Sequence, residues 1–181
     1  MTGFPADAEE IIGAAEVQTG FDNLAAPLQA LINERECLLL GVMNGGLYPL
    51  MQLLQRLQGD YLVDYCHVSR YRDSTRGGEL HWLRPPPDTV KGRTVVVIDD
   101  IFDEGETLQE VLKVCRESGA SEACSAVAFV KANPRRPAKL QPDYSSGMIV
   151  PDRYVFGCGM DYSGRWRHLP SVYALPPGAG T

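Results

Sequence analysis

Residues Val95–Leu108 read Val-Val-Val-Ile-Asp-Asp-Ile-Phe-Asp-Glu-Gly-Glu-Thr-Leu, and this stretch decides the fold. With the preceding threonine, Thr94–Ile98 is an unbroken run of β-branched residues, which is typical of a strand buried on both faces. Two carboxylates, Asp99 and Asp100, close the run. Beyond a short loop, apolar residues recur at spacings of three and four, which predicts a helix that opens at Thr107; these residues are Leu108, Val111, Leu112 and Cys115.

The loop between this strand and this helix carries a third carboxylate, Asp103, and a glycine, Gly105, that is free to take a positive φ. A helix start presents backbone N–H groups and the positive end of a dipole, and both favour a phosphate. The neighbouring acids are suited to sugar hydroxyls or to a Mg²⁺ ion. The residues alone also allow two other interpretations: acids that merely solvate the end of a strand, or the acid-ended site of a phosphoacceptor domain.

Length and charge limit the classes of protein that remain. At 181 residues, the chain is long enough for one domain with a sizeable core. Its 17 Lys+Arg against 23 Asp+Glu give a formal net charge of −6. Because nucleic-acid affinity comes mainly from neutralising phosphates, this balance disfavours a broad nucleic-acid surface, and we expect no nucleic-acid partner.

The cysteines and the N-terminal residues predict a cytoplasmic protein. The five cysteines are an odd number without a CxxC spacing, and most have apolar neighbours. We therefore expect buried thiols in a reducing compartment rather than a disulfide framework or a zinc site. Met1–Asp7 has neither the basic nor the apolar region of a secretory signal, and no apolar run reaches membrane-spanning length, so we expect no membrane partner.

Strand and helix patterns alternate along the rest of the chain, which predicts an α/β fold with a mainly parallel sheet flanked by helices. Aliphatic runs predict further strands at Cys37–Val42, Tyr61–His67 and Ala123–Lys131. Apolar spacings predict further helices at Ala8–Val17, Phe21–Asn33 and Leu47–Leu57.

Three segments between these elements read as loops. Met43–Gly46 joins a strand to a helix and is either a second anion cradle or only a tight turn. Ser69–Glu79 is polar and basic, and it is either a solvated loop or a lid over an anionic substrate. Asn133–Pro142 is rich in proline and arginine, and we expect Arg135 and Arg136 to be solvated there.

The central motif resembles the 5-phosphoribosyl-1-diphosphate (PRPP) binding motif of type I phosphoribosyltransferases. In that family two acids end a strand, and a third acid, a glycine and a threonine follow in the loop; the matching residues are Asp99, Asp100, Asp103, Gly105 and Thr107. Further motifs recur in the order and spacing of hypoxanthine-guanine phosphoribosyltransferases, at Lys131, Pro151–Val155, Gly157, Asp161–Tyr162 and Arg167. The resemblance runs from Cys37 to Leu175.

The resemblance implies a fold and a reaction. The family fold is a parallel sheet flanked by helices, with a small hood over the active site built from both ends of the chain. We therefore expect one domain over residues 1–175, with a core at 37–142, a hood from N-terminal residues and 143–175, and a disordered tail at 176–181. The implied reaction is purine salvage: a 6-oxopurine joins PRPP to give IMP or GMP and pyrophosphate, with Mg²⁺. The implied assembly is a homodimer or homotetramer.

The resemblance also assigns roles to single residues. The ribose and phosphate of PRPP fall to Asp99, Asp100, Asp103, Glu104, Gly105, Glu106 and Thr107. Pyrophosphate falls to Met43, Asn44, Gly45, Arg70, Tyr71 and Arg167. The purine falls to Lys131, Tyr154, Val155 and Asp161, and Mg²⁺ to Asp99, Asp100 and Asp161. Asp103, in the loop over the base, is the expected general acid/base at purine N7.

Three positions depart from the family pattern. Asn44 stands where relatives commonly carry Lys or Arg, in a loop that often has a non-proline cis peptide, which here would be Met43–Asn44. Asp99 replaces a frequent Glu, with a shorter reach and the same charge. Arg70-Tyr71 replaces the usual Ser-Tyr pair of the mobile loop, and Arg70 could supply part of the charge that Asn44 lacks.

Two alternatives stay open within this resemblance. One is a phosphoribosyltransferase for another base, xanthine or guanine alone. The other is a non-catalytic PRPP sensor, such as the RNA-binding attenuators that share the fold, although the acidic balance counts against it. Lys131 favours a 6-oxopurine over adenine, because an ammonium group can only donate hydrogen bonds.

Overall fold

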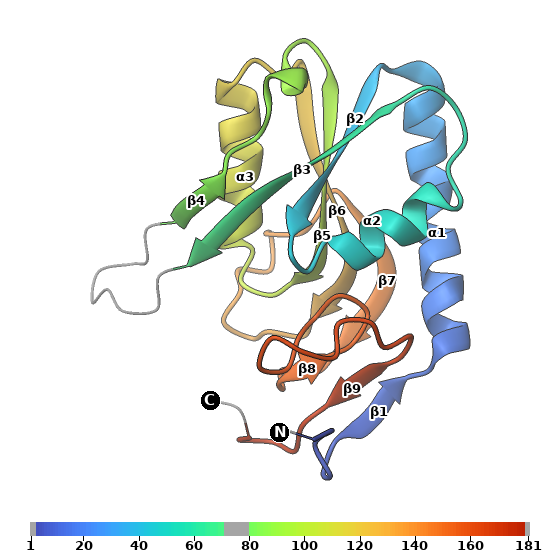
Figure 1. Cartoon of the computed structure of the whole chain (residues 1–181), viewed down its shortest axis with the longest axis vertical. Coiled ribbons are helices and arrows are strands. Elements are labelled where there is room, and N and C mark those ends of the chain that lie inside the picture. The colour runs from blue at the N-terminus through green and yellow to red at the C-terminus, as the bar shows by residue number, and fades with distance from the viewer. Residues whose placement is uncertain (1–2, 71–79, 180–181) are drawn as a thin grey trace.

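A six-stranded sheet forms the centre of this computed structural model, which describes residues 3–70 and 80–179. Its strand order is β4-β3-β2-β5-β6-β7, and every neighbouring pair is parallel except β3 and β4 (Figure 1). This arrangement confirms the predicted α/β fold with a mainly parallel sheet. The strands are β2 (Cys37–Met43), β3 (Leu62–Arg70), β4 (Leu80–Arg84), β5 (Thr94–Phe102), β6 (Glu122–Lys131) and β7 (Tyr144–Val150).

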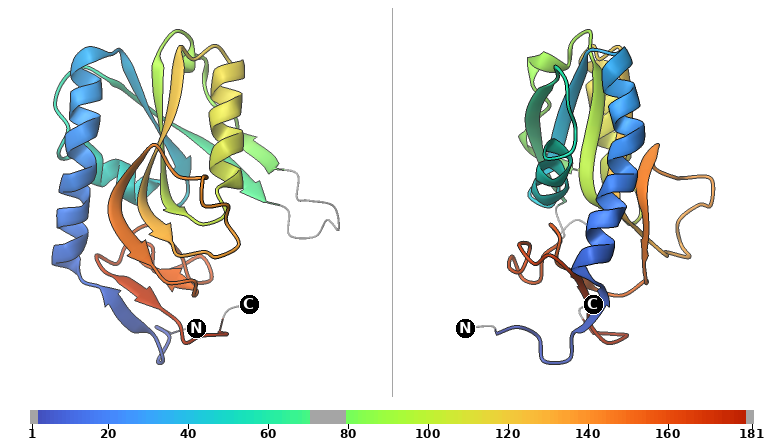
Figure 2. Two further views of the ribbon diagram at one scale, coloured as in Figure 1. Left: turned by 180° about the vertical axis from the view of Figure 1, so that it is seen from behind. Right: turned by 90° about the vertical axis from the view of Figure 1, so that its right-hand side faces the viewer.

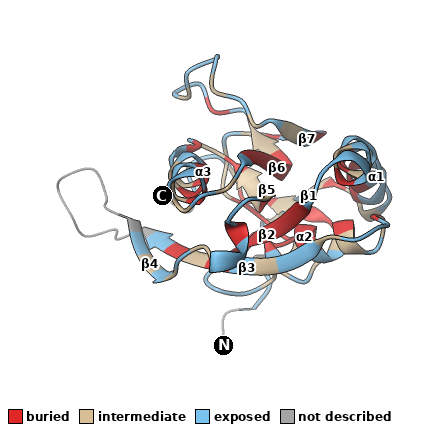
Figure 3. Ribbon diagram, turned by 90° about the horizontal axis from the view of Figure 1, so that it is seen from above, coloured by how far each residue is buried: buried red, intermediate tan, exposed pale blue. Residues whose placement is uncertain are grey.

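The sheet is buried on both faces because successive residues of its central strands enter different cores. In β5, Val95 and Val97 pack into the core that also holds helix α3 (Glu106–Glu117). Val96 and Ile98 pack into the core with α1 (Ala14–Glu34) and α2 (Leu47–Leu54). The helices therefore cover opposite faces, with α1 and α3 on either side of the sheet in Figures 2 and 3. The unbroken β-branched run of β5 is the sequence signature of this double burial.

The strand β5 is longer than predicted, and this difference positions the acids. It pairs with β6 as far as Phe102, whereas its pairing with β2 stops at Ile98. Asp99 and Asp100 therefore belong to the strand instead of following it. They lie in the part of β5 that extends beyond its pairing with β2. On that side the loop after β2 can approach them.

The N-terminal segment was predicted wrongly. In place of two helices, it forms a short strand β1 (Glu9–Ile12) and one continuous helix α1. The strand forms because β9 (Val172–Ala174), far away in the sequence, pairs with it in antiparallel fashion. The apolar pattern is interrupted at Gly20, but Gly20 is buried against the side chain of Met148 and does not end the helix. The predicted helices were Ala8–Val17 and Phe21–Asn33.

Both ends of the chain build a small second sheet with the order β1-β9-β8, where β8 is Val155–Phe156. Figure 1 shows this sheet below the carboxyl ends of the large sheet. Phe4 joins the two ends further, because its ring meets the rings of Phe156, Trp166 and Tyr173 edge-on at centroid distances of 5.2–5.7 Å. This is the hood that the resemblance implied.

Several smaller predictions can be compared with the structure. The strands β4 and β7 were not predicted, and a 3₁₀ helix (Asp88–Val90) follows the prolines at 85–87. Residues 176–179 form a turn, and 180–181 lie outside the described residues, as does 71–79, which holds most of the predicted lid. The domain boundaries stay a prediction.

The cysteines are buried and free, as predicted. Burial raises the pKa of the thiols of Cys66, Cys124 and Cys158 to about 12 and that of Cys115 to about 11. At neutral pH these thiols are protonated, so they act as small apolar core residues. Among the described residues, no helix is both long and apolar enough to cross a membrane.

Candidate active site

The predicted site residues gather where three parallel strands end. Met43 ends β2, the two acids lie near the end of β5, and Lys131 ends β6. These carboxyl ends meet at one edge of the sheet, which is the usual place for ligands in open α/β folds. The hood lies across the same edge and adds Tyr154, Val155 and Asp161.

The loop after β5 forms a pocket at the start of α3. Gly105 takes a φ of +83°, as predicted, and is the N-cap of the helix. A Cβ atom there would lie 2.7 Å from the ring of Phe102 and 3.2 Å from the side chain of Leu140, so the position also lacks space for a larger residue. The pocket is lined by Asp99, Ile101, Phe102, Asp103, Glu104, Gly105, Thr107 and Leu108. Of the residues predicted to bind PRPP, Asp100 and Glu106 do not line it.

The neighbouring carboxyl groups of Asp99 and Asp100 both have raised pKa values. Burial, followed by the charge of Asp100, raises the pKa of Asp99 well above its ordinary value. Burial also raises the pKa of Asp100, although the contact with Asp99, the Ile101 N–H and the charge of Arg167 oppose that rise. Two adjacent carboxylates with these pKa shifts favour the binding of a cation, because a cation would return both of them to the ionised form.

The donor set at these acids fits Mg²⁺. Across residues 3–70 and 80–179, no cluster of three His, Cys, Asp or Glu side chains could form a metal cage. Mg²⁺ commonly needs only one or two protein carboxylates and takes its other ligands from water and substrate phosphates. Asp99 and Asp100 match that requirement. Asp161 is different, because its oxygens accept hydrogen bonds from Gly164 N and from Arg167, both at 2.7 Å.

The loop after β2 packs directly on these acids. Its Met43–Asn44 peptide bond is cis. Gly45 is buried against the carboxylate of Asp100, which leaves no room for a Cβ atom. At Gly46, a Cβ atom would lie 2.5 Å from Val42 O. Both glycines are therefore required for the close packing of this loop.

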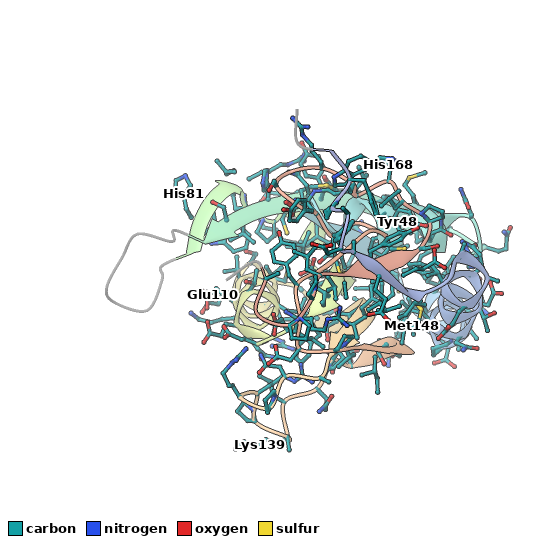
Figure 4. The ribbon with its side chains drawn as sticks, turned by 90° about the horizontal axis from the view of Figure 1, so that it is seen from below. Tyr48, His81, Glu110, Lys139, Met148 and His168 are labelled. Atoms are coloured by element: carbon teal, nitrogen blue, oxygen red, sulfur yellow. The ribbon has the colours of Figure 1, made fainter. Side chains whose placement is uncertain are left out.

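Asn44 and Arg167, two of the residues predicted for pyrophosphate, line a common pocket. Arg167 donates a hydrogen bond to the backbone oxygen of Gly159 at 2.7 Å. The pocket is lined by Asn44, Leu47, Tyr48, Met51, Gln52, Gly159, Arg167 and His168. Figure 4 shows Tyr48 and His168 on this side of the molecule. Met43 and Gly45 belong to the adjoining loop. Of the other two predicted residues, Tyr71 lies outside the described residues, and the side chain of Arg70 is not described either.

The four residues predicted for the purine line one further pocket. Lys131, Tyr154, Val155 and Asp161 share it with Asp100, Ile101, Asp103 and Met160. Tyr154 is half-buried and meets the ring of Tyr162 edge-on, with 5.8 Å between the centroids. Since Ile101 and Asp103 also line the pocket at the start of α3, the two pockets adjoin at these residues.

Asp103 is held at both carboxylate oxygens. Lys131 Nζ lies 2.8 Å from Oδ2, and Asn133 Nδ2 lies 2.7 Å from Oδ1. Arg136 donates to the backbone oxygens of Phe102 and Asp103 at 3.0 and 2.7 Å. The prediction of a solvated Arg136 was therefore wrong, whereas the side chain of Arg135 is 67% exposed as expected. The sequence of this loop offers no periodicity from which the contacts of Asn133 and Arg136 could be recognised.

Comparisons with known proteins show which family this chain resembles. The family model described as a phosphoribosyl transferase domain matches residues 13–163. The chain is 31% identical to the hypoxanthine-guanine phosphoribosyltransferase of Bacillus subtilis over 173 residues, which cover 94% of this chain and 95% of that protein. It is 31% identical to the enzyme of the same name from Lactococcus lactis, over 77% of this chain and 75% of that protein.

Solved structures show the same fold. A crystal structure of a hypoxanthine phosphoribosyltransferase from Staphylococcus aureus superposes with a TM-score of 0.84 and covers 96% of this chain and 94% of its own. A hypoxanthine-guanine phosphoribosyltransferase from Bacillus anthracis gives a TM-score of 0.80 over 92% of this chain and 98% of its own. Both are 22% identical to this chain, so these superpositions concern the fold alone.

Proposed function

This chain belongs to the phosphoribosyltransferase family, and we propose that it transfers the 5-phosphoribosyl group of PRPP to hypoxanthine or guanine, giving IMP or GMP and pyrophosphate. The observation that carries the proposal is the pocket shared by Lys131, Tyr154 and Asp103, beside the acids of the central motif. The names of the relatives from Bacillus subtilis and Lactococcus lactis support the same choice of base.

In this proposal the central motif binds PRPP. The 5′-phosphate lies on the loop amides between Asp103 and Thr107, at the positive end of α3. Asp99 and Asp100 accept hydrogen bonds from the ribose hydroxyls, and they are the residues that would hold Mg²⁺. The ion would supply positive charge to the pyrophosphate leaving group. The two carboxylates further stabilise the oxocarbenium-like charge that develops on the sugar as its bond to pyrophosphate breaks.

Arg167 is the proposed cation for the departing pyrophosphate, with Met43, Asn44 and Gly45 at the adjoining loop. Its guanidinium is already oriented by Asp161 and by the Gly159 carbonyl. Such fixed donors stabilise developing negative charge without having to reorganise. The contributions of Arg70 and Tyr71 and a second Mg²⁺ at Asp161 stay predictions.

Asp103 is the proposed general acid/base at purine N7. The two atoms that contact it, Lys131 Nζ and Asn133 Nδ2, can only donate hydrogen bonds, so they hold the carboxylate as an acceptor. That is the form required to take a proton from N7 as the bond to the ribose forms. The same group returns the proton in the reverse direction.

Lys131 sets the proposed base preference. The Lys131 side chain is 15% exposed. Its ammonium group can donate to the 6-oxo group or to N7, but it cannot accept from the 6-amino group of adenine. Adenine would leave a half-buried charge facing another donor, and such mismatches discriminate strongly. Tyr154 supplies an aromatic face, which tolerates different purines.

A single assay tests this function against its alternatives. Purified protein is mixed with PRPP, MgCl₂ and one of hypoxanthine, guanine, xanthine or adenine, and pyrophosphate release is measured. We expect turnover with hypoxanthine and guanine. Turnover with xanthine or with guanine alone would select the other-base alternative, and no release with any base would leave the non-catalytic PRPP sensor. Sedimentation equilibrium tests the predicted homodimer or homotetramer.

A further inference from the structure

We infer that Asn133 and Arg136 are positioning residues for the transfer reaction: Asn133 orients the Asp103 carboxylate, and Arg136 orients the amides of the phosphate-binding loop. The inference rests on the proposed function, because it takes Asp103 as the acid/base and the loop as the phosphate site. It adds a second layer of residues to the site, contributed by the segment that follows β6.

The orientation of the Asn133 side chain follows from its other contacts. It is 6% exposed, and its Oδ1 atom accepts from Arg135 N at 2.9 Å. Because a backbone N–H can only donate, this contact fixes which end of the amide carries oxygen. Nδ2 must then face Asp103, whose Oδ1 atom lies 2.7 Å away. The backbone also contributes, since Asn133 N donates to Lys131 O at 2.8 Å.

Asn133 therefore completes the coordination of a reactive carboxylate. Lys131 alone would hold one oxygen and leave the carboxylate free to rotate about it. With Asn133 on the other oxygen, the plane of the group is defined, and Lys131 and Asn133 approach it from one connected segment. A general base must be held in a narrow range of positions relative to its proton, so loss of this contact lowers turnover rather than substrate affinity.

Arg136 acts on the backbone of the loop. It holds two successive carbonyl groups, those of Phe102 and Asp103, and its guanidinium lies 4.9 Å from the centroid of the Phe102 ring. In a trans peptide the N–H group points away from the carbonyl of the same unit. Carbonyls fixed toward Arg136 therefore direct the N–H groups of Asp103 and Glu104 to the opposite side. Both residues line the pocket at the start of α3, where the 5′-phosphate is proposed to bind.

We therefore expect replacements of the two residues to cause different kinetic defects. In the Arg136→Ala variant the loop amides lose their fixed direction, and we expect the KM for PRPP to rise roughly tenfold or more with a smaller change in kcat, since hydrogen bonds to charged groups have effects of about that size. In Asn133→Asp, a near-isosteric change keeps the acceptor for Arg135 N and puts a carboxylate oxygen in place of the donor to Asp103. Here kcat falls roughly tenfold or more while the KM for PRPP stays within about twofold.

The matched control is Arg135→Ala, which removes a neighbouring, exposed arginine from the same loop and leaves both kinetic constants near wild type. Thermal unfolding of each variant shows that it is folded. The decisive measurement is the effect of Asn133→Asp in an Asp103→Asn background. If Asn133 acts through Asp103, the second substitution lowers kcat no further.

The outcomes separate this inference from the proposed function. Equal losses of kcat from Asn133→Asp in both backgrounds would give Asn133 a merely structural role and overturn its assignment. An unchanged KM for PRPP in Arg136→Ala would overturn the role of Arg136. A wild-type protein without turnover on any base would instead contradict the proposed function. In that case calorimetric PRPP binding to wild type and Arg136→Ala still decides the assignment of Arg136, and the absence of turnover removes that of Asn133.

Discussion

Replacing Gly105 by alanine tests the packing beneath the phosphate-binding loop. The new Cβ atom meets two penalties. The residue takes a φ of +83°, which costs roughly 1–2 kcal/mol for a residue with a Cβ atom. The atom also lies 2.7–2.9 Å from ring atoms of Phe102, which are fully packed, and such overpacking costs roughly 1–3 kcal/mol. We therefore expect Gly105→Ala to lose roughly 2–5 kcal/mol of unfolding free energy.

The chain offers a matched control for the first of these penalties. Gly92 takes a φ of +74°, but a Cβ atom there would have no atom within 4 Å. It precedes β5 at the opposite end from the site. For a chain of this length a loss of 1 kcal/mol lowers Tm by roughly 2–4 °C, so we expect Gly92→Ala to lower Tm by roughly 2–8 °C and Gly105→Ala by roughly 4–20 °C.

The assay is thermal unfolding of both variants, together with the KM for PRPP. Gly105→Ala must shift the loop to relieve the contact, so its KM for PRPP should rise roughly tenfold or more, whereas Gly92→Ala leaves it unchanged. Equal losses of stability in the two variants would show that Phe102 and Leu140 do not pack against the loop as described. A Gly105→Ala variant with the stability and KM of Gly92→Ala would refute the reasoning as a whole.

Three further predictions concern charged residues. Asp103→Asn should keep the fold and PRPP binding but lower turnover roughly a hundredfold, and a wild-type rate would remove its acid/base role. Lys131→Met should reduce kcat/KM for hypoxanthine and guanine and narrow their advantage over adenine; undiminished use of oxopurines would contradict the assigned contact. Asp99→Asn should raise Tm without metal at neutral pH. Because the pKa of Asp99 is raised, the folded state binds more protons than the unfolded state. The stability that the protonated carboxyl group contributes is lost as pH rises through the folded pKa, and the uncharged asparagine avoids that loss. The same variant should lose most of the Tm increase that MgCl₂ and PRPP give to wild type; an unchanged increase would argue against this acid as a ligand.

The parts of the fold that could be predicted are those that local sequence determines. The β-branched run of β5 and the glycine of its loop specify their own conformations, so the strand, the loop and the start of α3 were recognised from one stretch. The acids were recognised for the same reason. The purine residues, in contrast, came from the resemblance, since nothing local distinguishes Tyr154 from any other half-buried tyrosine.

The parts that could not be predicted depend on contacts between distant residues. Glu9–Ile12 is a strand because β9 lies beside it, and α1 continues through Gly20, which packs against Met148. Arg136 looked like a surface residue because its acceptors are backbone carbonyls contributed by another loop. Each of these assignments becomes available only once the two partners are known to be neighbours.

The position of β9 in the middle of the hood has a consequence for synthesis on the ribosome. Every strand of the large sheet is complete once Val150 has been added, and the phosphate-binding loop precedes that point. The hood strands β1 and β8 both pair with β9, which is made last. Translation proceeds at roughly 5–20 residues per second, and the N-terminal parts of the chain emerge first. The residues of the phosphate-binding loop are therefore made well before the central strand of the hood. A transcript broken ahead of codon 172 yields a product in which β1 and β8 have no central strand to join.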